Sequence, residues 1–307
     1  MPPASEFFQL ARLFTIVRFK NLCLVHTGNQ NYITSVINIL IHKLKERGNM
    51  KVLLFVFLIS VFAVKSFPQV HTETVEYKDG DVTLKGFLAY DKNIKGKHPG
   101  IIVAHEWWGL NDYPKMRAEE LAKLGYVAFA ADIYGNGTVA KTTDEAGKLS
   151  GEYSKDRNKV RRRMNEALDV IRRNQYVDVN NIAAIGYCFG GMCALELARS
   201  GADIKGVVVF HGILSTQNPD DGKYIKAKIL VCKGADDPYV KQDQVDAFEQ
   251  EMDKGKVDWQ VNIYSYAVHG FTNPANGNDP SRGVAYNKEA DMRSWQAMKD
   301  FFNEIFK

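Results

Sequence analysis

The sequence has few cysteines and no long apolar run, so it lacks the marks of a disulfide-rich, zinc-binding or membrane-spanning protein. It has only four cysteines, none in a CxxC pair, so neither a disulfide framework nor a zinc site is predicted. No apolar run reaches the roughly 20 residues that a comfortable membrane span needs, and no stable span is expected. Its 45% of hydrophobic residues is enough for one large core in an α/β protein of this length.

An excess of basic charge is also missing from most of the chain. The formal net charge is +4, but residues 1–51 hold seven Lys or Arg against two Asp or Glu, which leaves 33 basic and 34 acidic residues after them. No basic face argues for a nucleic-acid partner. His105 and Glu106 could suggest a metal pair, but no second histidine follows at helical spacing. We therefore expect no metal or other cofactor, and a small-molecule partner.

The most basic part of the chain has the pattern of a signal peptide that begins late. Met50 and Lys51 precede an apolar run over 52–64, and small Ser66 marks the expected cleavage site. This pattern predicts an uncertain extension over 1–49, a signal peptide over 50–66 and a globular domain over 67–307. Either translation starts at Met50 and the protein is exported, to a periplasm or the outside, or the run is an internal membrane anchor. The mature protein is expected to be a monomer or a small homo-oligomer.

From residue 70 onward, short apolar strands alternate with helical patterns. This alternation predicts an α/β fold, with a mainly parallel central sheet, helices on both faces and a ligand site beyond the carboxyl ends of the strands. The expected strands are an antiparallel pair, 72–77 and 82–90, followed by 101–104, 127–131, 182–185, 207–210, 229–231 and 261–264. The expected helices are 114–124, 155–174, 191–200, 240–252 and 289–306, the last burying Met292, Trp295, Met298, Phe301 and Phe302.

A glycine-rich turn around Cys188 carries the first chemical signal. Residues 186–191 read G-Y-C-F-G-G between the 182–185 strand and a helix. This is the nucleophile-elbow pattern G-x-S-x-G of α/β-hydrolase folds, with cysteine in place of serine. The N-terminus of the following helix would favour a thiolate. The alternative is a buried structural cysteine, which is the role we expect for Cys193 and Cys232.

Partners for Cys188 follow in the chain order nucleophile, acid, histidine that this fold uses. Asp237 comes three residues after Gly234 and after the 229–231 strand, and His269 comes after the 261–264 strand. Asp236 is the fallback acid. His211 also follows a strand, but it precedes the acid, so we expect a structural or pocket-lining role for it. Either aspartate could instead cap the next helix, and His269 could be a surface histidine.

The loop H-E-W-W-G at 105–109 follows the 101–104 strand, at the point where the fold supplies one oxyanion-hole N–H group. We expect this donor to be Trp107 and the second one to be Phe189, the residue after the nucleophile. The residues expected to line the substrate pocket are Trp108, Tyr134 and Phe271.

Together these segments resemble the dienelactone hydrolase family over residues 72–307. The matching segments are V-A-H-E-W-W-G at 103–109, G-Y-V at 125–127, A-D-I-Y-G at 131–135, G-Y-C-F-G-G at 186–191, Asp237 and H-G-F at 269–271. The resemblance implies the α/β-hydrolase fold and a triad of Cys188, Asp237 and His269. It also implies that Glu106 contacts the thiol and helps to deprotonate it when substrate binds.

One departure from the family limits the choice of substrate. The resemblance implies arginines that hold the carboxylate of dienelactone, one of them shortly after the histidine, but here no arginine follows His269 until Arg282. We therefore expect hydrolysis of other small esters or lactones, through an acyl-thioester at Cys188. Two alternatives stay open: a secreted binding protein without catalysis, and a thioesterase or peptidase on the same fold.

Overall fold

A computed structural model describes residues 68–306 of the chain. The predicted extension and signal peptide, 1–49 and 50–66, lie outside these residues. Among the described helices, none is long and apolar enough to cross a membrane.

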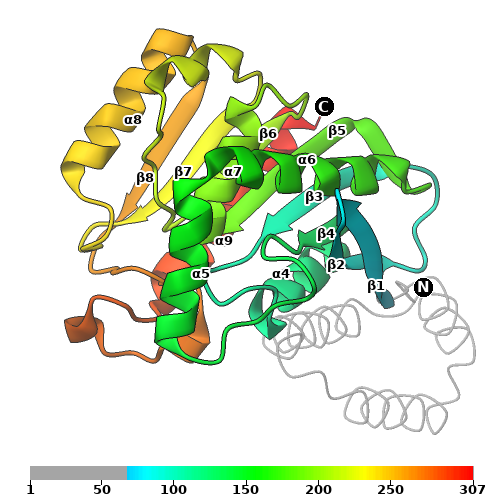
Figure 1. Ribbon diagram of the computed structural model, residues 1–307, viewed down its shortest axis with the longest axis horizontal. Helices are drawn as coiled ribbons and strands as arrows, with labels where there is room; N and C mark the ends of the chain where they lie inside the picture. The colour runs from blue at the N-terminus through cyan, green and yellow to red at the C-terminus, as the bar shows by residue number, and fades with distance from the viewer. Residues whose placement is uncertain (1–67, 307) are drawn as a thin grey trace, which may run out of the picture. The chain divides into compact units, whose positions relative to one another are not determined.

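The described part of the chain is built around one twisted sheet (Figure 1). The strands are β1 (Val70–Asp79), β2 (Val82–Asp91), β3 (His98–Ala104), β4 (Val127–Ala131), β5 (Val177–Tyr187), β6 (Gly206–Phe210), β7 (Lys228–Gly234) and β8 (Trp259–Tyr264). Their order across the sheet is β1-β2-β4-β3-β5-β6-β7-β8. β1 pairs antiparallel with β2, and β2 antiparallel with β4, whereas all pairs from β4 to β8 are parallel. The predicted α/β-hydrolase sheet, with its antiparallel opening pair, is confirmed.

Helices cover both faces of this sheet. They are α4 (Asp112–Lys123), α5 (Thr143–Lys155), α6 (Arg157–Arg173), α7 (Phe189–Arg199), α8 (Gln242–Gly255) and α9 (Lys288–Ile305). Alternate strand residues point to opposite faces, so Ile102 joins one core with α6, α7 and α8, and Val103 joins the other with α4 and α9. The central strands carry apolar, buried side chains on both faces, so each face of the sheet contributes to a hydrophobic core.

The helix predicted over 155–174 is confirmed as α6, but the sequence analysis missed α5, which directly precedes it. The two helices are separated by a bend at Asp156 (φ −109°, ψ 78°), whose carboxylate caps α6 by accepting from Lys159 N at 2.9 Å. α5 begins with Thr142 as its N-cap, accepting from Glu145 N at 3.2 Å. Its glycines and serines hide its helical periodicity, but Thr142 and Glu145 carry the spacing of a capping box.

The burial expected for the last helix needs one correction. The buried stripe of α9 is Ala290, Ser294, Met298 and Phe302, at regular i, i+4 spacing. Met292 falls off this stripe and is 62% exposed.

Candidate active site

Cys188 lies at the tip of a sharp turn between β5 and the first residue of α7. Its backbone has φ 54° and ψ −117°, a conformation that side-chain-bearing residues rarely adopt and that costs of order 1–3 kcal/mol. Its N–H donates to Phe210 O at 3.0 Å, which ties the turn to β6. The side chain is partly exposed, unlike the fully buried Cys193 and Cys232. The predicted elbow geometry is therefore present.

The glycines of the turn are required by close backbone approaches. A Cβ on Gly186 would overlap the carbonyl of Gly190, and a Cβ on Gly190 would overlap the carbonyl of Ala104. A Cβ on Gly191 would lie 2.8 Å from Gly212 Cα. The second approach is the important one, because it brings the elbow against the end of β3 and hence against the loop that begins at His105.

His269 and Asp237, which follow β8 and β7, form a hydrogen-bonded pair. His269 Nδ1 lies 2.9 Å from Asp237 Oδ2. The other oxygen, Oδ1, accepts from the N–H groups of Tyr239 and Val240 at 2.9 and 3.3 Å, so the carboxylate has a fixed orientation. Asp236 is exposed, whereas Asp237 is buried. The structure therefore places Asp237, and not the fallback Asp236, beside the imidazole.

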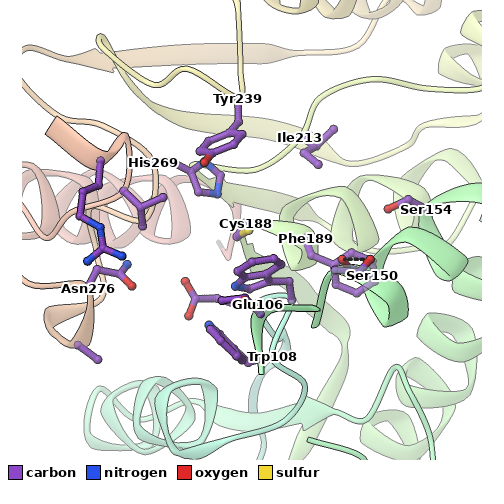
Figure 2. A pocket seen from close by; sticks show the side chains of 16 residues that line it. Glu106, Trp108, Ser150, Ser154, Cys188, Phe189, Ile213, Tyr239, His269 and Asn276 are labelled. Atoms are coloured by element: carbon purple, nitrogen blue, oxygen red, sulfur yellow. Dashed lines mark hydrogen bonds between the residues drawn. The ribbon is translucent and has the colours of Figure 1, made fainter. Parts of the chain in front are cut away.

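The surroundings of His269 favour its protonated form. Burial lowers the pKa of the ring, but the Cys188 sulfur and the Asp237 carboxylate, through charge and hydrogen bonding, raise it well above the usual histidine value. Because Nδ1 is bound to Asp237, Nε2 is the ring nitrogen left to act toward the cysteine. Figure 2 shows the imidazole beside Cys188.

His211 packs against the ring of His269 on its buried side. It is fully buried, its Nε2 is 2.7 Å from Thr272 Oγ1, and its ring stands edge-on to that of His269 with centroids 5.2 Å apart. Burial, and the charges of His269 and Arg117, lower its pKa well below the usual value. Tyr113 hydroxyl reaches the same Thr272 oxygen at 2.6 Å. His211 thus supports the loop after His269, in line with the structural alternative.

A cavity of about 610 Å³ opens in front of Cys188. Within the described residues, those that line it are Glu106, Trp107, Trp108, Thr143, Gly147, Ser150, Ser154, Cys188, Phe189, Ile213, Tyr239, His269, Ala275, Asn276, Arg282 and Val284. In Figure 2, His269 and Asn276 lie on one side of Cys188, and Phe189, Ser150 and Ile213 lie on the other. This volume suits a small organic molecule held with its reacting atom at the sulfur.

The two N–H groups predicted to form an oxyanion hole belong to residues that line this cavity. Phe189 is the first residue of α7, so its N–H has no acceptor within the helix. Trp107 N–H has no acceptor among the described residues. Two donors without partners beside a nucleophile candidate can hold the oxygen of a tetrahedral intermediate.

Glu106 lines the cavity but is held by Asn273. Its Oε2 accepts from Asn273 Nδ2 at 2.8 Å, and no hydrogen bond joins it to Cys188 within residues 68–306. Burial raises the pKa of the carboxyl, against the opposing effects of Asn273 and the positive charge of His269. One carboxylate oxygen is therefore held by an amide, and the contact with the thiol that the resemblance implies when substrate binds stays a prediction.

Two residues expected to line the pocket do not do so. Tyr134 is buried beneath the cavity, where its hydroxyl donates to Trp107 O at 2.9 Å and its ring packs on His105. Phe271 is fully buried against His211 and Tyr264. Both lie next to functional loops in the sequence, but their side chains point into the core. Trp108 lines the cavity as expected.

Other cavity residues have little signal in the sequence. Ser150 and Ser154 come from the helix α5 that periodicity hides. Arg282 belongs to a 3₁₀ turn, η3 (Pro280–Arg282), and the sequence alone does not show that this turn reaches the cavity. Asn273 could have been found, because it lies four residues after His269 in the same loop. Over residues 68–306, no group of three side chains suited to a metal ion is present.

The fold and the turn around Cys188 define a protein of the α/β-hydrolase class. The sequence model described as the dienelactone hydrolase family matches residues 84–306, and the chain belongs to this family. A protein of Aquifex aeolicus, named as a candidate carboxymethylenebutenolidase, is 28% identical over 76% of this chain and 99% of its own. Family membership makes the chain a carboxylic ester hydrolase.

Solved structures agree with this assignment. One titled m3DLH is 39% identical, with a TM-score of 0.75, and covers 78% of this chain and 99% of its own. A dienelactone hydrolase-like promiscuous phosphotriesterase, P91, from metagenomic libraries is 41% identical, with a TM-score of 0.73, and covers 77% of this chain and 98% of its own.

Proposed function

We propose that the chain hydrolyses small esters or lactones by acyl transfer through Cys188. The observation that carries this proposal is the 2.9 Å hydrogen bond between His269 Nδ1 and Asp237 Oδ2, made beside a cysteine on a strained elbow. An imidazole oriented by a carboxylate and facing a thiol is the arrangement that activates a nucleophile.

The reaction proceeds in two steps. The Cys188 thiolate attacks the ester carbonyl, and the oxygen that becomes negative accepts from the N–H groups of Trp107 and Phe189. His269, protonated at Nε2, gives its proton to the leaving alcohol as the carbon–oxygen bond breaks and a thioester forms. The same nitrogen then takes a proton from water, whose oxygen attacks the thioester and releases the acid. Both products leave with the thiolate and imidazolium restored.

Glu106 regulates this reaction through its proton. Its buried carboxyl lies on the cavity wall with Asn273 as its hydrogen-bond partner. A substrate that displaces Asn273 frees the carboxylate to take the proton from any Cys188 that is still a neutral thiol, and Glu106 releases this proton when the products leave.

The test of the nucleophile is alkylation with iodoacetamide at neutral pH. Among the cysteines of residues 68–306 we expect only Cys188 to react, with loss of p-nitrophenyl acetate hydrolysis in parallel. Cys193 and Cys232 serve as internal controls, because both are fully buried and burial raises the pKa of the Cys232 thiol to about 12. Mass spectrometry locates the label. Full alkylation at Cys188 with hydrolysis retained would contradict the proposal, and a protein inactive on every ester would favour a binding role.

Arg282, a positively charged residue of the cavity wall, favours substrates with a negative charge on the part that lies beside it. Residues 283–285 run beside His269, since His269 N donates to Gly283 O at 3.2 Å and Ala285 N donates to His269 O at 3.1 Å. Arg282 therefore belongs to the His269 side of the cavity, where the leaving alcohol receives its proton. Its guanidinium forms no ion pair with an acid of residues 68–306.

Arg282→Gln is therefore expected to weaken binding of esters whose leaving alcohol is anionic. The side chain is exposed, so we expect KM to rise only about three- to tenfold, with kcat unchanged. KM for neutral p-nitrophenyl acetate should not change, and Arg293→Gln, an exposed arginine outside the cavity lining, is the matched control. An equal rise in KM for neutral and anionic esters would contradict an electrostatic role.

A further inference from the structure

His105 is fully buried and does not line the cavity, so the reaction leaves it without a role. It follows directly after β3. Its ring packs on those of Tyr134 and Phe189, with centroid distances of 4.8 and 6.0 Å, and these two rings also contact each other, with centroids 5.5 Å apart. Complete burial against this aromatic pair leaves the imidazole little freedom to rotate. A polar ring held this firmly in a core must have its nitrogens satisfied.

The hydrogen bonds of the ring determine where its proton lies. Ile133 N–H, which can only donate, points at His105 Nε2 at 3.2 Å. Nε2 is therefore the acceptor, and Nδ1 carries the hydrogen. Nδ1 lies 2.6 Å from the carbonyl oxygen of Glu106 and donates to it. Burial lowers the pKa of the ring, which keeps it neutral and so keeps Nε2 free to accept.

The Glu106 carbonyl shares a peptide plane with the Trp107 N–H. In a trans peptide these two groups point in opposite directions, and the described chain has no cis peptide. Fixing the carbonyl toward His105 therefore fixes the N–H in the opposite direction. The next carbonyl, that of Trp107, is also held, by the Tyr134 hydroxyl at 2.9 Å. The loop is thus anchored on both sides of the Trp107 N–H, which itself has no acceptor in the described structure.

We propose that His105 is the positioning residue of the oxyanion hole, holding the Glu106–Trp107 peptide so that the Trp107 N–H faces the cavity beside Cys188. A peptide turned the other way would present a carbonyl oxygen to the developing negative charge and repel it. The inference rests on the proposed function, because the N–H matters only if an oxyanion forms there.

Two substitutions separate the two nitrogens of the ring. In His105→Asn the side-chain amide takes the place of Nδ1 and keeps donating to Glu106 O. In His105→Gln the amide oxygen takes the place of Nε2 and accepts from Ile133 N–H, which leaves Glu106 O with only Gly109 N, at 3.2 Å. Losing an oxyanion donor outright costs 10²–10³-fold, so we expect the looser peptide in the Gln variant to lower kcat by about tenfold, with KM little changed. The Asn variant should stay within about threefold of the parent.

Iodoacetamide separates this role from a structural one. Alkylation displaces iodide from a saturated carbon and forms no oxyanion, so its rate at Cys188 should be the same in the parent and both variants. Equal loss of kcat in the Asn and Gln variants, or alkylation slowed in parallel with hydrolysis, would overturn the inference. If the Gln variant does not fold, the Asn variant alone still tests the inference, because a tenfold or greater loss of kcat there, with alkylation of Cys188 unchanged, would overturn it. Failure of the proposed function is distinguishable, because hydrolysis would then survive alkylation of Cys188 in the parent enzyme.

Discussion

Cys188→Ala is expected to lower kcat/KM for p-nitrophenyl acetate by at least about 10⁴-fold, since removing the nucleophile of a triad abolishes the covalent route. The cavity, the two free N–H groups and the His269–Asp237 pair would all remain. The substitution removes the Cys188 thiol, which is partly exposed, whereas the other two thiols of the described residues are buried. A small residual rate, from binding and oxyanion stabilisation alone, is expected.

The matched control for this substitution lies five residues along the chain. Cys193→Ala removes the same thiol group, here from within α7, but that thiol is fully buried in the core and outside the cavity lining. We expect full activity with a loss of unfolding free energy of about 1 kcal/mol, because a small cavity is created. Undiminished turnover by Cys188→Ala, or equal losses in the two variants, would refute the assignment of Cys188.

Much of the fold and the site was predictable because the signals are local. The elbow needs glycines at 186, 190 and 191, and the structure shows which carbonyls and Cα atoms a side chain there would meet. The order of Cys188, Asp237 and His269 follows from parallel strands, whose carboxyl ends meet at one edge of the sheet. Neither signal requires knowledge of how distant loops pack.

What could not be predicted depends on side-chain direction and on loops that meet only in the folded chain. Tyr134 lies next to the site along the chain, but its ring faces the core and only its hydroxyl serves the Trp107 loop. Arg282 reaches the cavity because residues 283–285 pair with His269. The Asn273 amide donates to a carboxylate oxygen of Glu106, the side chain for which the family resemblance implied a contact with the thiol. Residue spacing carries no information about such contacts, because each depends on how segments that are distant along the chain pack in the folded protein.

Asp237→Asn is expected to lower kcat by about 10³–10⁴-fold, the loss seen when the acid of a triad becomes an amide. An asparagine oxygen can still accept from the N–H groups of Tyr239 and Val240, so the turn should be preserved. The NH₂ group of the amide can then face His269 Nδ1, which favours the wrong tautomer of the ring. Asp236→Asn, an exposed change of the same type next to it, is the control and should be silent.

The same substitution should change the pH dependence of the reaction in a defined direction. Burial lowers the pKa of His269, whereas Cys188 and Asp237 raise it, and the net pKa lies well above the usual histidine value. Removing the charge of Asp237 takes away one raising contribution, so the imidazolium loses its proton at lower pH. The alkaline limb of kcat/KM, which reports that loss, should therefore move to lower pH.

Stability gives an independent measure of the same pair. A histidine whose pKa is raised on folding adds stability that is fully present below its unfolded pKa, about 6.5, and is lost as pH rises through the folded value. The parent should therefore lose unfolding free energy over that alkaline range, and Asp237→Asn should lose less of it. Chemical unfolding at several pH values measures both. Parallel stability curves, with an unmoved alkaline limb, would mean that Asp237 only caps the turn at 237–240 and does not act on His269.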